Sequence, residues 1–239
     1  MKPIIGVVLR PDVLDNKSIF KINDNVRTSI ISSGGIPIGI LPIQNIDYNK
    51  SEPIKTAYLT NEEKENIISV IKLCDGILLA GGSKWFEYDE FIVNYAVKNN
   101  IPVLGVCLGM QTIVSALNCN KNIINDITKL NNTIINHNQP NKNYVHNVRI
   151  LPNTKLYNII GKEKLMVNSR HSYHCEKLNK LGPSAYSSDG LLEAVELPNK
   201  QFILGVQWHP EDLINSDNDS IKIFRTFIEA CIKYKEKKA

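Results

Sequence analysis

The sequence predicts an α/β fold in which helices flank a doubly wound, mostly parallel sheet, joined by a smaller antiparallel β region. Short apolar runs alternate with amphipathic helical segments as far as Ala116, which is typical of a parallel sheet covered on both faces. Beyond that point, short strand-like segments separated by turn residues replace the alternation. We expect residues 1–239 to form a single domain.

Composition is that of an ordinary globular protein. Of the 239 residues, 43% are hydrophobic and 22% charged, and the formal net charge is +4. This mild charge gives no indication of nucleic-acid binding, and no apolar run has the length of a membrane span. The N-terminus runs into a strand pattern without a signal peptide. Five cysteines without paired spacing then favour free thiols and a cytoplasmic location.

The parallel region is predicted element by element from apolar runs and helical periodicity. Strands are expected at residues 3–9, 36–41, 75–80 and 101–106, and helices at 18–33, 60–73, 89–98 and from 108 onward. The first helix carries Ile22, Val26 and Ile30 on one face. The second begins with a capping box formed by Thr60 and Glu63. Residues 10–17 are polar and are predicted as a loop.

The rest of the chain is predicted as short strands and two helical segments. Strands are expected at residues 123–124, near 134, and at 144–151, 164–168, 184–187, 191–196 and 202–207. The pair Asp189-Gly190 indicates a hairpin turn between two of them. A helical turn at 154–160 and a final amphipathic helix at 220–235 complete the pattern.

The first chemical signal is Cys107, which lies between Gly105 and Gly109 where a predicted strand turns into a helix. This is the nucleophile-elbow pattern with cysteine in place of serine. A sharp strand-to-helix turn crowds its neighbours, so the flanking positions must lack side chains. The thiol would lie at a helix N-terminus, whose dipole favours the thiolate. The pentapeptide alone fits a buried structural cysteine equally well.

Two further signals lie at the ends of other predicted strands. His209 and Glu211 flank a proline that stiffens the segment, so the carboxylate can orient the imidazole while the imidazole draws a proton from Cys107. The glycine pair 81–82 follows another strand. A backbone N–H there, together with that of Leu108, would bind the oxyanion of a tetrahedral intermediate. Taken alone, the His-Pro-Glu segment also fits a surface turn, and the glycine pair fits an ordinary strand-ending turn.

Together these motifs resemble the class I glutamine amidotransferase superfamily, and within it the gamma-glutamyl hydrolase-like branch that includes gamma-glutamyl-GABA hydrolase. The resemblance covers nearly the whole chain and rests on segments 78–82, 102–111, 125–127, 167–171, 189–196 and 205–211. It implies a flavodoxin-like arrangement of the sheet, with Cys107 as nucleophile, His209 as general base and acid, and Glu211 as the orienting carboxylate. It also implies an oxyanion hole made by the amides of Gly82 and Leu108, and a substrate site near Gln111, Asn168, Ser169 and His171.

Two segments depart from the pattern of that branch. An acidic residue and a proline often follow the glycine pair, whereas this chain has Lys84, Trp85 and Phe86. The segment that begins at Asn168 continues into Ser172-Tyr173-His174 rather than into the usual polar partner. Because these loops would shape the leaving-group side of the pocket, they leave the substrate open and the thiol chemistry intact.

We therefore expect a cysteine-dependent hydrolase that cleaves γ-glutamyl amide bonds of a small molecule through a glutamyl thioester, without a cofactor. Two alternatives are a glutaminase subunit that supplies ammonia to a partner synthase, and a catalytically silent binding module on the same fold. The sequence leaves open whether the chain forms a homodimer.

No metal site is expected from the histidines. His171 and His174 have a spacing of three, but they follow a strand-like run and no carboxylate pattern completes a site. His137 and His146 lie in polar stretches, and we expect no chemical role for them.

Overall fold

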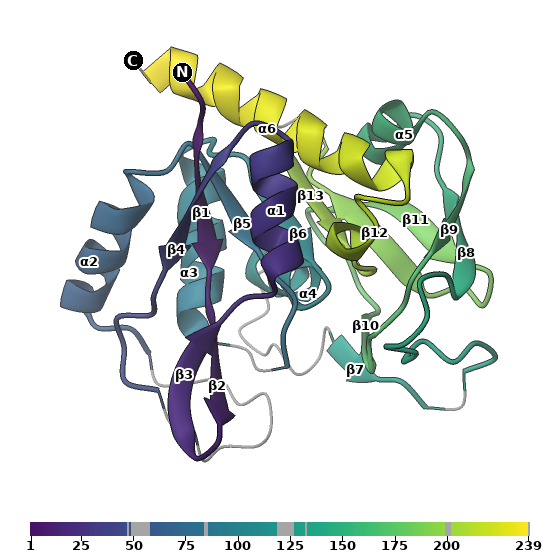
Figure 1. Ribbon diagram of the computed structural model, residues 1–239, viewed down its shortest axis with the longest axis horizontal. Coiled ribbons are helices and arrows are strands. Elements are labelled where there is room, and N and C mark those ends of the chain that lie inside the picture. The colour runs from purple at the N-terminus through teal and green to yellow at the C-terminus, as the bar shows by residue number, and fades with distance from the viewer. Residues whose placement is uncertain are drawn as a thin grey trace.

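The computed structural model of the protein contains a large central sheet with helices on both faces (Figure 1). It describes residues 1–46, 48, 58–83, 86–118, 127–131, 133–198 and 202–238. Within this part of the chain, the strand order of the sheet is β4-β1-β5-β6-β13-β12-β11-β8-β9. The first five strands pair in parallel and the others antiparallel. The predicted α/β fold class is confirmed.

The parallel half follows the predicted runs closely. Its strands are β1 (Ile4–Val8), β4 (Ile36–Ile40), β5 (Gly76–Leu79), β6 (Val103–Val106) and β13 (Ile203–Val206). The helices between the strands are α1 (Asp24–Ser32), α2 (Asn61–Ile71), α3 (Glu87–Lys98) and α4 (Leu108–Leu117). Helix α2 begins with the expected capping box: the side chains of Thr60 and Glu63 each accept a hydrogen bond from the backbone amide of the other residue.

The helices form two layers that bury separate apolar cores against the sheet. Helices α2, α3 and α4 pack on one face. On the other face lie α1, α5 (Lys155–Ile160) and α6 (Asn218–Lys238), as Figure 1 shows. Helix α6 ends beside the N-terminus, where Lys235 donates a hydrogen bond to the carbonyl of Lys2. Among the described helices, none is both long and apolar enough to cross a bilayer.

The antiparallel half consists of β12 (Leu192–Glu196), β11 (Gly182–Ser187), β8 (His146–Ile150) and β9 (Lys164–Val167). The predicted hairpin joins β11 to β12, and Gly190 adopts a φ of 86° in its turn. A separate two-stranded sheet pairs β7 (Ile127–Lys129) with β10 (Tyr173–Cys175). The strand predicted at 123–124 lies outside the described residues, and the one predicted near Ile134 is wrong because that residue lies in a bend.

The prediction for residues 10–21 is also wrong. Instead of a loop and the start of a helix, the chain forms a hairpin of β2 (Arg10–Leu14) and β3 (Lys17–Lys21), and α1 begins only at Asp24. Asp15 and Asn16 occupy the turn at φ 48° and 60°, which matches the two left-handed positions of a tight hairpin. The hairpin extends from the carboxyl end of β1 (Figure 1).

Candidate active site

The strand-to-helix turn at Cys107 has the geometry of a nucleophile elbow. Cys107 adopts φ 52° and ψ −106°, a strained conformation for a residue with a side chain. The turn is tight on both sides: a Cβ added to Gly105 would lie 2.6 Å from the backbone of Gly109, and one added to Gly109 would lie 2.0 Å from the carbonyl oxygen of Leu79. The cysteine amide donates to the Val206 carbonyl at 2.8 Å, so β13 holds the turn in place.

His209 and Cys107 leave neighbouring parallel strands at the same edge of the sheet, since Val106 of β6 pairs with Val206 of β13. Gly81, after β5, lies between the two side chains. A Cβ placed on Gly81 would be 2.7 Å from Cε1 of His209 and 3.6 Å from Cβ of Cys107. The imidazole and the thiol therefore approach each other across this glycine.

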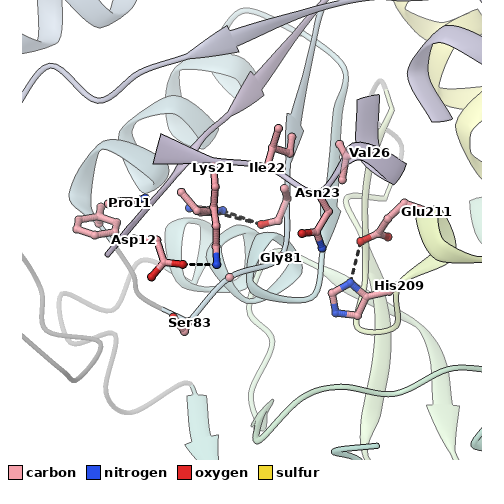
Figure 2. Close-up of a pocket in the computed structure, with 14 residues that line it drawn as sticks. Pro11, Asp12, Lys21, Ile22, Asn23, Val26, Gly81, Ser83, His209 and Glu211 are labelled. Carbon is pink, nitrogen blue, oxygen red and sulfur yellow. Dashed lines mark hydrogen bonds and ion pairs between the residues drawn. The ribbon is translucent and has the colours of Figure 1, made fainter. Parts of the chain in front are cut away.

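Glu211 holds the other side of the imidazole. Nδ1 of His209 lies 2.8 Å from Oε1 of Glu211 within a short 3-10 turn (Pro210–Asp212), as Figure 2 shows. Burial opposes a charge on the imidazole, but the charges of Glu211 and of the Cys107 sulfur, and hydrogen bonds with both, raise the pKa of His209 well above its ordinary value. This environment favours the imidazolium form of His209 beside the thiol group that would attack a carbonyl.

Asn168 fixes the backbone that carries the imidazole. Its side-chain amide donates to the His209 carbonyl at 2.8 Å, and its side-chain oxygen accepts from the His209 amide, also at 2.8 Å. The asparagine is fully buried and follows the end of β9. We expected it near the substrate; in the structure both ends of its side chain are engaged by the backbone of His209.

Arg10, which the sequence prediction assigned to a loop, braces the strand end that carries the glycine pair. Its Nε and Nη2 donate to the Ala80 carbonyl at 3.2 and 2.8 Å, while Nη1 lies 2.5 Å from the buried carboxylate of Asp89. Gly82 lies next to Leu108, because a Cβ added there would be 3.0 Å from the leucine side chain. The first amides of a helix such as α4 have no intrahelical acceptor, so this corner can supply donors to an oxyanion.

A cavity of about 280 Å³ opens beside these groups (Figure 2). His209 and Glu211 line one side of it, the residues 81–83 after β5 line another, and the β2–β3 hairpin with the start of α1 closes the rest. Two basic side chains of the hairpin line this cavity, Arg10 and Lys21, and Lys21 is paired with Asp12. Phe86 also lines the cavity, whereas Lys84 and Trp85 lie outside the described residues.

The other residues expected near the substrate, Gln111, Ser169 and His171, are buried and are not among the described residues that line the cavity. Gln111, one turn into α4, donates to the side chain of Gln207 at 3.0 Å and to the carbonyl of Tyr173 at 3.1 Å. Ser169 and His171 face a separate buried group of histidines. Their geometry supports the scaffold of the site rather than an open binding surface.

Comparison with known proteins gives three similarities. The family model Peptidase C26 matches residues 87–211, the segment that contains Cys107, His209 and Glu211. A glutamine amidotransferase-like protein of Rickettsia prowazekii is 30% identical over 96% of this chain and 98% of its own length. A CTP synthase of Flavobacterium psychrophilum is 31% identical over 74% of this chain, a match that spans only 40% of that enzyme.

A solved structure extends the comparison to the fold. The glutaminase domain of Trypanosoma brucei CTP synthase, solved with bound acivicin, has a TM-score of 0.65 over 97% of this chain and 94% of that chain. Its sequence identity is 20%, so the likeness concerns the fold alone.

Proposed function

Because this chain belongs to the Peptidase C26 family of class I glutamine amidotransferase-like proteins, we propose that it is a cysteine-dependent hydrolase of γ-glutamyl amide bonds. The observation that carries the proposal is the imidazole of His209, which lies between the Glu211 carboxylate and the thiol at the elbow. In such an arrangement the carboxylate fixes one ring nitrogen and leaves the other to serve the nucleophile.

The proposed reaction proceeds through a thioester. The Cys107 thiolate attacks the γ-carbonyl carbon, and the amides of Gly82 and Leu108 stabilise the resulting oxyanion. The imidazolium of His209 then protonates the leaving amine as the C–N bond breaks, which leaves a glutamyl thioester. The neutral imidazole next takes a proton from water, the hydroxide attacks the thioester, and glutamate leaves as the thiol is restored. Glu211 stays ionised throughout and holds the imidazole in place.

The substrate would be a small γ-glutamyl amide, of which γ-glutamyl-GABA is the compound suggested by the branch that the sequence resembles. The cavity beside His209 would take the leaving amine. Lys21 and Asn23 line this cavity, so a polar or acidic amine fits its chemistry better than an apolar one.

A panel of γ-glutamyl amines together with glutamine tests the proposal by following the release of glutamate from the purified chain. The Cys107→Ala variant should lose turnover while keeping the fold, because the thiol has no substitute as nucleophile. Full activity in that variant would end the proposal. Trapping of the acyl intermediate on Cys107, seen as a mass increase after rapid quenching, would support the thioester route.

A second candidate is a glutaminase subunit that supplies ammonia to a synthase. The sequence match to a CTP synthase favours it. If it is correct, glutamine is the best substrate in the panel, and ammonia release depends on a co-purifying partner. A silent binding module is the third reading, and it predicts that Cys107 fails to react with an electrophilic glutamine analogue.

A reducing compartment such as the cytoplasm fits the proposed chemistry, since an oxidised Cys107 cannot attack a carbonyl. Among the described cysteines, Cys74, Cys107 and Cys231 are buried free thiols. Fractionation of cells that produce the protein, followed by thiol labelling, tests this location.

A further inference from the structure

A second group of ionisable side chains surrounds the carboxylate of Glu193 on β12. Three imidazoles each bring one ring nitrogen close to its Oε1: Nδ1 of His137 at 3.4 Å, Nε2 of His146 at 3.4 Å and Nε2 of His171 at 3.6 Å. None of the four residues is more than 5% exposed. The sequence offers no reason to expect a role for His137 and His146; the structure buries both beside one carboxylate.

The other nitrogen of each imidazole faces an acceptor. Nε2 of His137 lies 3.1 Å from the Asp189 carboxylate, Nδ1 of His146 lies 3.3 Å from the carbonyl of Asn147, and Nδ1 of His171 lies 2.9 Å from the carbonyl of Tyr173. Each acceptor draws the ring proton to its own side. In a neutral imidazole the nitrogen that faces Glu193 then carries a lone pair, the arrangement that metal-binding histidines adopt.

These lone pairs point at a carboxylate, which repels them unless a cation or a proton lies between. Nε2 of His146, Nε2 of His171 and both Glu193 oxygens have no hydrogen-bond partner among the described residues. Buried polar atoms without a partner are costly. The contacts of 3.4–3.6 Å are also longer than a charge-assisted hydrogen bond of about 2.7–2.9 Å.

The ligand atoms of His137, His146 and Glu193 lie within 4.8 Å of one another, close enough to hold one metal ion, and Nε2 of His171 lies 3.6 Å from the same carboxylate oxygen. With bonds of about 2.0–2.1 Å, neighbouring ligand atoms of a tetrahedral zinc site lie about 3.3–3.5 Å apart. The donor set of three imidazole nitrogens and one carboxylate oxygen suits a first-row divalent ion, whereas calcium and magnesium prefer oxygen ligands. Asp189 would hold His137 in the required tautomer, as carboxylates do behind metal-bound imidazoles.

We propose that His137, His146 and Glu193 bind one divalent transition-metal ion, Zn²⁺ in the first instance, and that the neighbouring imidazole of His171 completes the ligand set. With His171 as the fourth ligand the coordination would be closed to substrate, so the ion would be structural. The ion would connect four segments of the chain: the one before β8 with His137, the start of β8 with His146, the one after β9 with His171, and β12 with Glu193. The site departs from the sequence expectation of no metal, which weighed only the pair His171 and His174.

The ion would also restrict the position of the His209 imidazole indirectly. His171 lies three residues after Asn168, whose side chain holds the backbone of His209. Fixing one end of this short segment to β12 restricts where the other end can place His209. This role is one of positioning and does not depend on which amide the active site cleaves.

A metal-free arrangement is the competing explanation. Burial opposes a charge on His137, but Glu193 and Asp189 raise the pKa of that imidazole above its ordinary value, so a protonated His137 would bridge the two carboxylates. Ser169 Oγ, 3.4 Å from Nδ1 of His137, offers another proton donor. This explanation leaves Nε2 of His146 and of His171 unpartnered, whereas a metal ion uses both.

Metal analysis of the purified, untagged chain tests the proposal. Elemental analysis after incubation with Zn²⁺ and desalting should find about one zinc ion per chain in the wild type. The Cys107→Ala variant should retain it, which excludes binding at the active-site thiol. Glu193→Gln and His146→Ala should lose it. His174→Ala is the matched control and should keep it, because that imidazole lies 3.6 Å from Glu176 instead.

A second measurement covers the case in which the ligand variants fail to fold. Wild-type protein stripped with a chelator should unfold at a lower temperature, and one equivalent of Zn²⁺ should restore the midpoint. Cobalt in place of zinc should give the visible absorption of a tetrahedral site. Wild-type protein that takes up no stoichiometric metal, or that holds the same amount as Glu193→Gln, would overturn the proposal and leave the protonated His137 as the explanation.

Discussion

Replacing Asn168 with alanine separates a positioning residue from a substrate-binding one. Its side chain makes two hydrogen bonds of 2.8 Å to the backbone of His209. Truncation leaves that amide and that carbonyl without partners in a buried position, at about 1–3 kcal/mol each, so the free energy of unfolding should fall by about 2–6 kcal/mol. If His209 then shifts by about 1 Å, kcat should fall on the order of 100-fold.

The kinetic signature decides between the two roles. A positioning residue that touches no substrate should lower kcat and leave KM close to that of the wild type. The assay is glutamate release at saturating and limiting γ-glutamyl amide, alongside urea unfolding. A raised KM with unchanged kcat would refute this reasoning and restore the expectation, drawn from the sequence resemblance, that Asn168 binds substrate.

Asn118→Ala is the matched control for lost stability. Asn118 is also a buried asparagine whose side chain holds backbone at two points, the Lys177 carbonyl at 2.7 Å and the Asn179 amide at 3.0 Å. It lies at the opposite end of α4 from the elbow. We expect a similar loss of stability with kcat unchanged. An equal fall of kcat in this control would mean that general loosening, not the position of His209, explains the result.

Two further predictions concern the imidazole and the elbow. Glu211→Gln removes a carboxylate that raises the pKa of His209. The raised pKa adds stability below about pH 6.5, and this stability is lost as pH rises through the pKa of the folded state. The free energy of unfolding in urea should therefore depend less on pH in the variant, and the same pH dependence as in the wild type would contradict this. Gly109→Ala places a Cβ 2.0 Å from the Leu79 carbonyl oxygen and should cost about 3 kcal/mol or more by thermal unfolding. Gly190→Ala is the control: its Cβ would meet no atom within 4 Å, and only the φ of 86° disfavours a side chain there. It should lower the free energy of unfolding by about 1–2 kcal/mol. Equal losses of stability in the two variants would argue against crowding at the elbow as the cause of the Gly109→Ala effect.

The parallel half of the fold could be predicted because buried strands carry their signal locally. Runs such as residues 76–79 are apolar throughout, so no register or partner has to be known. The β2–β3 hairpin lacks that signal, since most of its side chains are exposed or half-buried. Its turn depends on the left-handed conformations of Asp15 and Asn16, and polar residues in sequence fit a loop equally well.

The candidate site divides in the same way. The elbow and the His209-Pro-Glu211 segment are short motifs whose chemistry can be inferred from neighbouring residues. Arg10 could not be recognised, because its partner carbonyl at Ala80 lies 70 residues away. The histidines around Glu193 show no ligand spacing along the chain, and only folding reveals that they share one carboxylate. The available signal was the co-occurrence of three histidines and an acidic residue in otherwise polar segments.

The two halves of the sheet contribute differently to the proposed chemistry. The parallel half supplies the elbow, since β6 and the start of α4 fix Cys107. The antiparallel half holds the imidazole at two points. Asn168, after β9, binds the backbone of His209. The Glu193 carbonyl of β12 accepts a hydrogen bond from the amide of Gln207, which lies two residues before His209. Gln111 of α4 donates to the side chain of Gln207 and so links the nucleophile's helix to the same strand. A shift of β12 would therefore be transmitted through β13 both to His209, which follows that strand, and to Cys107, whose amide donates to the Val206 carbonyl. Only His209 is also held from the antiparallel half through Asn168, so changes around Glu193 should alter the relative alignment of the imidazole and the thiol.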